Sequence, residues 1–249
     1  MSKTKGVALS GFVKVETQVV RRIVARISGM EKSGKTHFSL TAPAPIAYFE
    51  LDRNLEGVGV NFVGKKDIYS KSYRELDPSS QDEHEHKWEM FKADYMMAVE
   101  APEIRTIIID TDTEVYEMVR LAKLGRLTNV MPYQYGPVNK EMRHLVESAK
   151  STDKNFIFIG KMKKMYVDAG KKGEATWNGE WERAGFHDMR YVVQCNLQTF
   201  QAEDNEFGIR VIDCGLNGGI RGEELIGDMC NFPYLGMTVY EDTQLGDWE

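Results

Sequence analysis

The sequence predicts an α/β fold in which a mostly parallel central sheet is flanked by helices. Short apolar runs alternate with helical patterns between residues 19 and 160. One of these runs, at residues 106–110, reads Thr-Ile-Ile-Ile-Asp, which is typical of a central parallel strand covered on both faces. A glycine-rich loop at residues 29–36 stands between a predicted strand and a predicted helix. Strands and helices that alternate in this way favour a parallel sheet.

The first predicted elements surround the glycine-rich loop. Residues 19–27 alternate in the manner of a strand, and the three arginines among them, which include Arg26, predict one exposed side. The helix after the loop must end near Thr41, because two prolines follow it closely. The compact apolar run at residues 46–50 predicts a second strand.

The middle of the chain predicts three helices and another strand. Residues 78–99 open with the start signal Ser-Ser-Gln-Asp and have the pattern of a solvated amphipathic helix. Two more helical patterns cover residues 114–127 and 138–150, with prolines between them. Residues 155–160 are apolar after their first asparagine and predict another buried strand.

The last third of the chain predicts an antiparallel hairpin at the edge of the sheet. Residues 190–200 and 208–213 have the pattern of two strands around a turn at Asp204-Asn205. We expect one domain over residues 1–249. Its appendages are an N-terminal extension (1–18), a basic, glycine-rich mobile loop or ribbon (161–187) and a loose acidic tail (241–249).

Composition bounds the class of protein without giving a function. The net charge of −6 argues against bulk electrostatic coating of DNA, although a local basic patch remains compatible with it. No run of about eighteen apolar residues exists, so we expect no membrane span. The three cysteines, Cys195, Cys214 and Cys230, form no CxxC pair, which favours reduced thiols and a cytoplasmic location.

The glycine-rich loop matches the phosphate-binding pattern G-x-x-x-x-G-K-[ST]. Its residues are Gly29, Met30, Glu31, Lys32, Ser33, Gly34, Lys35 and Thr36. In such a loop the backbone N–H groups point at phosphate oxygens, the lysine reaches the β- and γ-phosphates and the hydroxyl binds Mg²⁺. The position between a strand and a helix is the context that the pattern requires. The sequence therefore predicts a nucleoside triphosphate site, with ATP and Mg²⁺ as cofactors.

Asp110 is the predicted metal-side acid of this site. It ends the Thr-Ile-Ile-Ile strand, where a carboxylate can hold Mg²⁺ through water and complete a Walker B site. The alternative is an acid that caps the next helix, a role that Asp112 or Thr113 is equally able to fill.

Hydrolysis also needs a group that orients the attacking water. Glu50 and Asp52 end the second predicted strand, and Asp112 and Glu114 follow Asp110. Each of the four also has an ordinary interpretation as a solvated loop acid.

In these motifs the sequence resembles the phage-encoded, RecA-like P-loop ATPases that promote single-strand annealing or recombination, which are also described as phage AAA-type nucleotide-binding proteins. The resemblance covers about residues 22–213. Its motifs are the phosphate loop, residues 48–57 (Tyr-Phe-Glu-Leu-Asp-Arg-Asn-Leu-Glu-Gly), the strand ending at Asp110, Tyr135-Gly136 with Asn139, residues 155–160 and His187-Asp188.

The resemblance implies a RecA-like core and a place for the catalytic residues beside Lys35. Asp52, or failing that Glu50, occupies the position of the catalytic acid in that family. The end of the strand at 155–160 is implied to sense the γ-phosphate, but the chain has Gly160-Lys161 where Gln, His or Thr is commoner. A homo-oligomer, in a ring or a filament, is also implied, as is a location in the host cytoplasm.

The segment after residue 160 is the predicted contact with single-stranded DNA. Its lysines are Lys161, Lys163, Lys164, Lys171 and Lys172. Tyr166, Trp177 and Trp181 are interleaved with them, and basic groups with stacking aromatics are what a single-strand binder needs. The alternative is a solvated hairpin whose aromatics pack on the core, since three glutamates dilute the charge.

These observations predict an ATP-dependent DNA recombination or annealing factor, an ATPase that is slow without DNA or oligomerisation. A single-strand binding protein is a possible partner. Two alternatives stay open. One is a nucleotide-switched loader or packaging accessory without DNA-stimulated catalysis. The other is a small-molecule kinase, against which the segment at 161–187 counts because Arg183 is the only arginine that a lid would offer.

Overall fold

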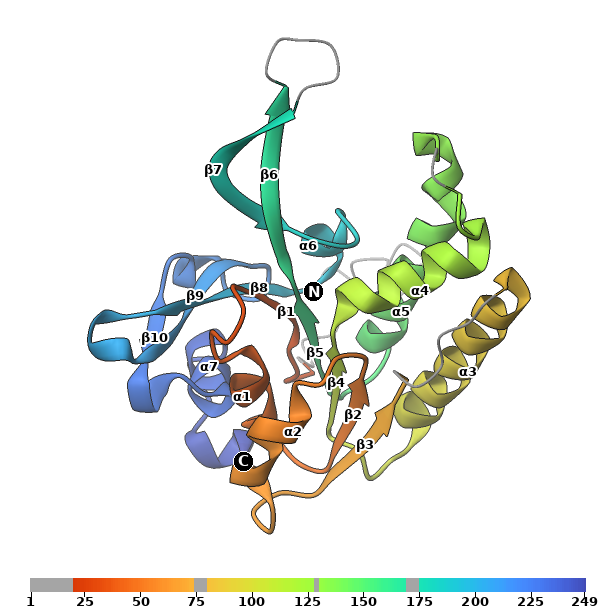
Figure 1. Ribbon diagram of the computed structural model, residues 1–249. Coiled ribbons are helices and arrows are strands. Elements are labelled where there is room, and N and C mark those ends of the chain that lie inside the picture. Colours follow the sequence, from red (N-terminus) through yellow and green to blue (C-terminus); the bar gives the residue numbers. More distant parts are fainter. Residues whose placement is uncertain (1–19, 74–79, 128–129, 169–174) are drawn as a thin grey trace, which may run out of the picture.

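The chain folds around one eight-stranded sheet, with a second, two-stranded sheet beside it (Figure 1). The computed structural model describes residues 20–73, 80–127, 130–168 and 175–249. The predicted extension at 1–18 lies outside the described residues, as do Lys171 and Lys172. The strand order in the large sheet is β10-β9-β8-β1-β5-β4-β2-β3.

Six neighbouring strands of the large sheet are parallel, which confirms the predicted mostly parallel sheet, although β3 was not predicted and β8 was predicted only as a strand of the antiparallel hairpin. They are β1 (Val24–Ser28), β2 (Ile46–Glu50), β3 (Ile68–Ser72), β4 (Thr106–Asp110), β5 (Asn155–Gly160) and β8 (Cys195–Gln201). β1 lies between β5 and β8, in the middle of the sheet. Because parallel strands end at the same edge, their carboxyl ends bring the predicted site residues together.

The predicted antiparallel hairpin is confirmed. β8 pairs with β9 (Phe207–Cys214) around a short 3₁₀-helix, Glu203–Asn205. The hairpin begins later than expected, because Met189–Val192 forms the short helix α6. β10 (Glu224–Ile226), the strand that completes this side of the sheet, was not predicted.

Helices cover both faces of the large sheet (Figure 1). The helices are α1 (Lys35–Leu40), α2 (Leu55–Val58), α3 (Gln81–Glu100), α4 (Asp112–Leu124), α5 (Gly136–Lys150), α6 and α7 (Phe232–Val239). Phe49 and Ile107 pack with α3, α4 and α5, whereas Tyr48 and Ile108 pack with α1 and α7. Successive strand residues thus serve opposite faces, which explains why these runs are apolar throughout.

The start signal of the long helix α3 is confirmed. The Ser80 hydroxyl accepts a hydrogen bond from the backbone N–H of Glu83 at 3.3 Å, and the Glu83 side chain accepts one from the Ser80 N–H at 3.4 Å. Trp88, Phe91 and Tyr95 line the buried side of the helix. Their spacing of three and four residues makes one apolar stripe, so α3 is amphipathic as predicted.

The expectation of a loose acidic tail is wrong. Trp248 is only 2% exposed and stacks on Tyr240, with 5.6 Å between the ring centroids. Its Nε1 donates a hydrogen bond to the Thr243 hydroxyl at 3.0 Å. A Cβ at Gly236 would lie 2.3 Å from the Trp248 ring, so α7 needs glycine where the tail crosses it. One aromatic side chain therefore anchors the acidic segment.

The segment after β5 forms a ribbon of two antiparallel strands, β6 (Met162–Asp168) and β7 (Ala175–Arg183). This confirms the ribbon form of the prediction. Figure 1 shows the ribbon rising away from the large sheet, next to α6. None of the helices in the described part of the chain combines the length and the apolar composition that a bilayer-spanning segment requires.

Candidate nucleotide-binding site

The phosphate loop connects the carboxyl end of β1, in the middle of the sheet, to α1. Gly34 has a φ of +84°, the left-handed region that glycine enters without strain. A Cβ at Gly29 would lie 1.9 Å from the Thr199 hydroxyl oxygen, because β8 passes directly beside the loop. Both glycines of the motif are therefore required by the geometry, one by the backbone turn and one by close packing.

Lys35 folds back over the loop. Its Nζ donates hydrogen bonds to the backbone oxygens of Gly29, at 3.0 Å, and Met30, at 2.5 Å. Burial lowers the pKa of Lys35, while the nearby carboxylates of Asp110 and Glu31 oppose this effect. An ammonium group hydrogen-bonded to carbonyl oxygens is available to phosphate oxygens, which carry more negative charge.

Thr36 and Asp110 meet at the centre of the site, as predicted. The Thr36 hydroxyl donates a hydrogen bond to Asp110 Oδ2 at 2.8 Å. Tyr48 OH donates to the same oxygen at 2.5 Å, and Asn54 Nδ2 donates to Oδ1 at 3.1 Å. Burial raises the pKa of Asp110, and the three hydrogen bonds act in the opposite direction. The first turn of α1 and the end of β4 are thus joined through one buried carboxylate.

This donor set fits Mg²⁺ held together with a nucleotide. A hydroxyl and a carboxylate are hard oxygen ligands, and Mg²⁺ usually takes one or two protein ligands plus phosphate oxygens and water. In the part of the chain that the structure describes, no group of three or more His, Cys, Asp or Glu side chains forms a metal cage. Thr36 and Asp110 are the residues that would hold the ion.

Both candidates for the water-orienting acid lie at the edge of the sheet that carries the loop. Glu50 is the register partner of Asp110 and is 7% exposed. Asp52 follows the end of β2 with a side chain that is 39% exposed, and its Oδ2 lies 2.6 Å from Lys161 Nζ. The choice between Asp52 and Glu50 stays a prediction.

The two acids that follow Asp110 are also paired with basic side chains, Asp112 with Arg26 and Glu114 with the same lysine as Asp52. Arg26 Nε and Nη2 donate to the two carboxylate oxygens of Asp112 at 2.6 and 3.1 Å. Glu114 pairs with Lys161 at 2.5 Å. Thr111, and neither Asp112 nor Thr113, caps α4, because its hydroxyl accepts a hydrogen bond from the backbone of Glu114.

The prediction that Arg26 lies on an exposed side is wrong. The side chains of Arg26 and Asp112 are both 2% exposed. Two charged groups can be buried in this way because they have opposite charges and are hydrogen-bonded to each other. A Cβ at Gly160 would lie 2.6 Å from the Arg26 guanidinium. The glycine at the end of β5, where the resembling family has a polar side chain, makes room for this arginine.

Sequence reasoning missed two contacts of Asp110, with Tyr48 and Asn54. Tyr48 lies two residues before Glu50 on β2. Alternate residues of a strand point to the same face, so the sequence pattern already places Tyr48 on the face of Glu50. Asn54 lies in the turn before α2, and its position beside Asp110 depends on tertiary structure alone.

The ribbon lysines occupy different environments. Lys161 lies at its root, bound to two acids, and Lys163 pairs with Glu182 at 3.3 Å. Lys164 Nζ lies 4.9 Å from the centroid of the Trp177 ring. Tyr166, Trp177 and Trp181 are between 41% and 58% exposed. The alternative in which these aromatics pack on the core is therefore wrong.

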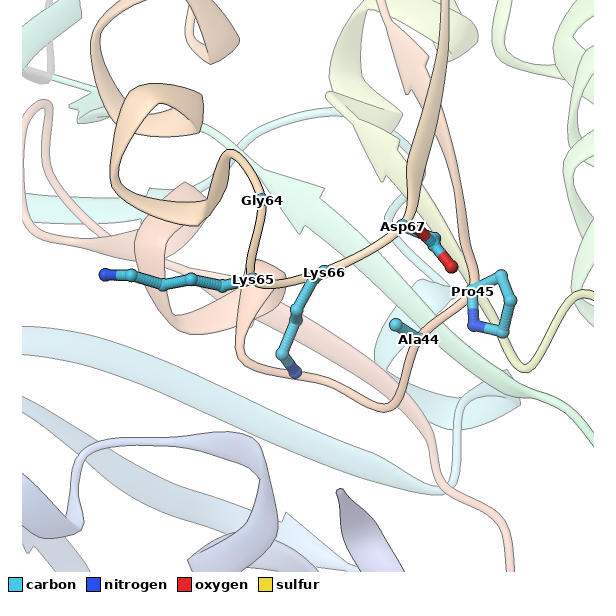
Figure 2. Close-up of a pocket in the computed structure, with 6 residues that line it drawn as sticks. All are labelled: Ala44, Pro45, Gly64, Lys65, Lys66 and Asp67. Carbon is cyan, nitrogen blue, oxygen red and sulfur yellow. The ribbon is translucent and has the colours of Figure 1, made fainter.

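A cavity of about 320 Å³ lies elsewhere (Figure 2). Its lining residues are Ala44, Pro45, Gly64, Lys65, Lys66 and Asp67. They precede β2 and β3, at the edge of the sheet opposite the phosphate loop. Lys66 Nζ donates to the backbone oxygens of Thr41 and Ala42, and Figure 2 shows Lys65 extending away from Pro45. The cavity is thus remote from the candidate site.

One comparison with known proteins identifies the family. A family model described as an AAA domain matches residues 21–207 of the 249, from β1 through the phosphate loop, the Asp110 strand and the ribbon to the start of β9. No curated protein matches the chain. The matched region contains every element that builds the site described above. The chain belongs to the AAA-domain family of P-loop ATPases.

Proposed function

We propose that the protein binds Mg²⁺·ATP at the phosphate loop and couples ATP hydrolysis to the binding of single-stranded DNA by the β6–β7 ribbon. It would act in DNA recombination or single-strand annealing, as the resemblance to RecA-like phage ATPases suggests. One observation carries the proposal. One residue, Lys161, separates the ribbon from the end of β5, which lies at the same edge of the sheet as the phosphate loop and Asp110.

The ribbon presents a face suited to stacking on bases. Trp177 and Trp181 lie edge to face, with 6.1 Å between ring centroids, and Lys164 covers Trp177. Tyr166 is the cross-strand partner of Trp177. Exposed aromatic rings beside a lysine form a platform for nucleobases, because each base offers a π-face and each phosphate a charge.

Charge along the ribbon indicates which force dominates. In the sequence, residues 161–183 contain six basic residues, Lys161, Lys163, Lys164, Lys171, Lys172 and Arg183, and four acidic ones, Asp168, Glu174, Glu180 and Glu182. The net charge of this segment is therefore only +2, so phosphate neutralisation adds modestly to stacking, which supplies about 1–3 kcal/mol per base. Binding through this ribbon is expected to have a small salt dependence.

Replacing both Trp177 and Trp181 by alanine tests this platform. We expect the affinity for oligo-dT to fall about 100-fold, because about 3 kcal/mol of stacking is lost. Fluorescence anisotropy of a labelled oligonucleotide measures this. Tyr69→Ala is the matched control, since Tyr69 is another exposed aromatic, 63% exposed, on the strand at the far side of the sheet. A double variant that binds as tightly as the wild type would contradict the assignment.

Two isosteric changes decide which acid orients water. Asp52→Asn is expected to lower kcat about 100-fold while nucleotide affinity is retained, because only the transition state needs the carboxylate. Glu50→Gln is expected to have the smaller effect. Single-turnover hydrolysis gives the rate, and fluorescent-nucleotide titration gives the affinity. If annealing activity survives both changes, hydrolysis is not the mechanism, and the nucleotide-switched loader becomes the better account.

Partners beyond DNA belong to the same proposal. Assembly into a ring or filament, and cooperation with a single-strand binding protein, rest on the resemblance to RecA-like phage ATPases. Light scattering with and without ATP and DNA measures the assembly directly. Growth of the particle only when both ligands are present is the expected result.

A further inference from the structure

Both ends of the ribbon are fastened to the segment that follows Asp110. At one end, the backbone N–H of Lys161 donates to the Thr113 hydroxyl at 3.1 Å. At the other, the Ala184 carbonyl accepts a hydrogen bond from Arg26, whose guanidinium is bound by Asp112. A backbone hydrogen bond of 2.9 Å from Ala184 to Lys161 closes the root. The ribbon root is therefore joined to Thr113 directly and to Asp112 through Arg26.

The side chain of Lys161 turns from this root towards the nucleotide edge. Its Nζ lies 2.6 Å from Asp52 Oδ2 and 2.5 Å from Glu114 Oε1. Burial acts to lower the pKa of Lys161, but the hydrogen bonds to the two carboxylates outweigh it and raise the pKa. The lysine therefore stays cationic and bridges the segment after β2 to α4.

An ion pair of this kind contributes little to stability, since all three side chains are between 38% and 40% exposed. Its position is what matters. Asp52 must offer a carboxylate oxygen to the attacking water, and Lys161 holds one of the two, Oδ2. The residue that holds it is also the first residue of the ribbon root.

We infer that Lys161 is a positioning residue that restrains Asp52 in the DNA-free protein and releases it when DNA displaces the ribbon root. The inference rests on the proposed function, in which Asp52 orients water and the ribbon binds DNA. In this inference Lys161, at the end of β5, acts on the Asp52 carboxylate and not on the γ-phosphate of ATP. The lysine thereby links DNA binding to turnover.

The test compares Lys161→Met with Lys161→Arg, in the full chain. Without DNA, Lys161→Met is expected to raise kcat about fivefold, the scale of a half-exposed ion pair, with KM for ATP unchanged. The ratio of rates with and without oligo-dT falls towards one. Lys161→Arg keeps the charge and the donors and is expected to restore both wild-type values.

Lys123→Met is the matched control. Lys123 also bridges two carboxylates, Glu85 at 3.5 Å and Glu141 at 3.9 Å, and all three residues lie on the helices α3, α4 and α5, away from Asp52. Its removal is expected to leave kcat and the DNA ratio as in the wild type. A merely structural role for Lys161 would make the two methionine variants behave alike.

Two results would overturn the inference. One is a fall in kcat together with a rise in KM for ATP, which would place Lys161 on the nucleotide. The other is a Lys161→Met variant that matches the wild type in both rates. Failure of the proposed function can be distinguished from failure of this inference, because the hydrolysis rate measured without DNA does not depend on DNA binding. If DNA does not stimulate the wild type, a DNA-free rise that Asp52→Asn abolishes still supports restraint of Asp52 by Lys161.

Discussion

Replacing Lys35 by alanine is expected to lower ATP turnover about 1,000-fold, because an ammonium group that contacts phosphate contributes about 4 kcal/mol when desolvated. The Nζ of Lys35 is held by the carbonyl oxygens of Gly29 and Met30, two uncharged acceptors that a phosphate oxygen replaces favourably. Nucleotide affinity is expected to fall with the rate, because the proposed contact of Lys35 with phosphate is made in the bound state as well.

Isothermal titration with a non-hydrolysable ATP analogue measures the affinity, and phosphate release measures the rate. Lys65→Ala is the control, because Lys65 lies beside the cavity at the opposite edge of the sheet. A Lys35→Ala variant that keeps wild-type affinity and turnover would remove the phosphate loop from the account.

Replacing Asp110 by asparagine is expected to lower Mg²⁺-dependent turnover about 1,000-fold, because a metal ion supplies several kcal/mol of charge stabilisation at a transferring phosphoryl group. The amide preserves the shape of the carboxylate but removes its charge. Since burial raises the pKa of Asp110, the fold already disfavours that charge, and the neutral variant is expected to stay folded.

A Mg²⁺ titration of the rate, with thermal unfolding alongside, tests this prediction. Asp94→Asn is the matched control, because Asp94 accepts a hydrogen bond from Tyr73 OH at 2.8 Å and pairs with Lys71, as a second tyrosine-bound aspartate away from the site. If Asp110→Asn keeps both its rate and its Mg²⁺ dependence, the metal is held elsewhere.

Three of the buried parallel strands could be predicted to the residue, because each is a continuous apolar run with a breaker or an acid at its end, whereas β1 begins at Val24 and not at residue 19 as predicted. β2, β4 and β5 have the predicted bounds. β3 was not predicted, since its five residues, Ile-Tyr-Ser-Lys-Ser, are mostly exposed at the edge of the sheet and leave no apolar run. An edge strand has only one neighbouring strand and is less buried, so its sequence shows a weaker hydrophobic pattern.

The C-terminal part of the chain contains local signals for a helix start and for an aromatic anchor. Asn231 caps α7 by accepting a hydrogen bond from the Tyr234 N–H, and a proline follows in the first turn. Both are ordinary marks of a helix start. Trp248 stands among acidic residues in the sequence. A tryptophan gains much by burying its large ring, so its presence indicates that this segment can pack against the domain.

Within the site, local motifs were predictable and long-range pairs were not. The phosphate loop and its contact with Asp110 follow from a fixed pattern and from a strand that ends in an acid. The Arg26–Asp112 pair joins residues 86 positions apart, and the bridge from Lys161 to Asp52 joins two different strand ends. No local pattern encodes such pairs, because they depend on how parallel strands are ordered in the sheet.

The rate of ATP hydrolysis with and without single-stranded DNA tests the central claim most directly, compared between the wild type and the Trp177→Ala, Trp181→Ala double variant. Lys35→Ala sets the background. The account predicts that DNA stimulates the wild type strongly and leaves the double variant at its DNA-free rate. A wild type whose turnover is indifferent to DNA, or a double variant stimulated as fully as the wild type, would contradict it.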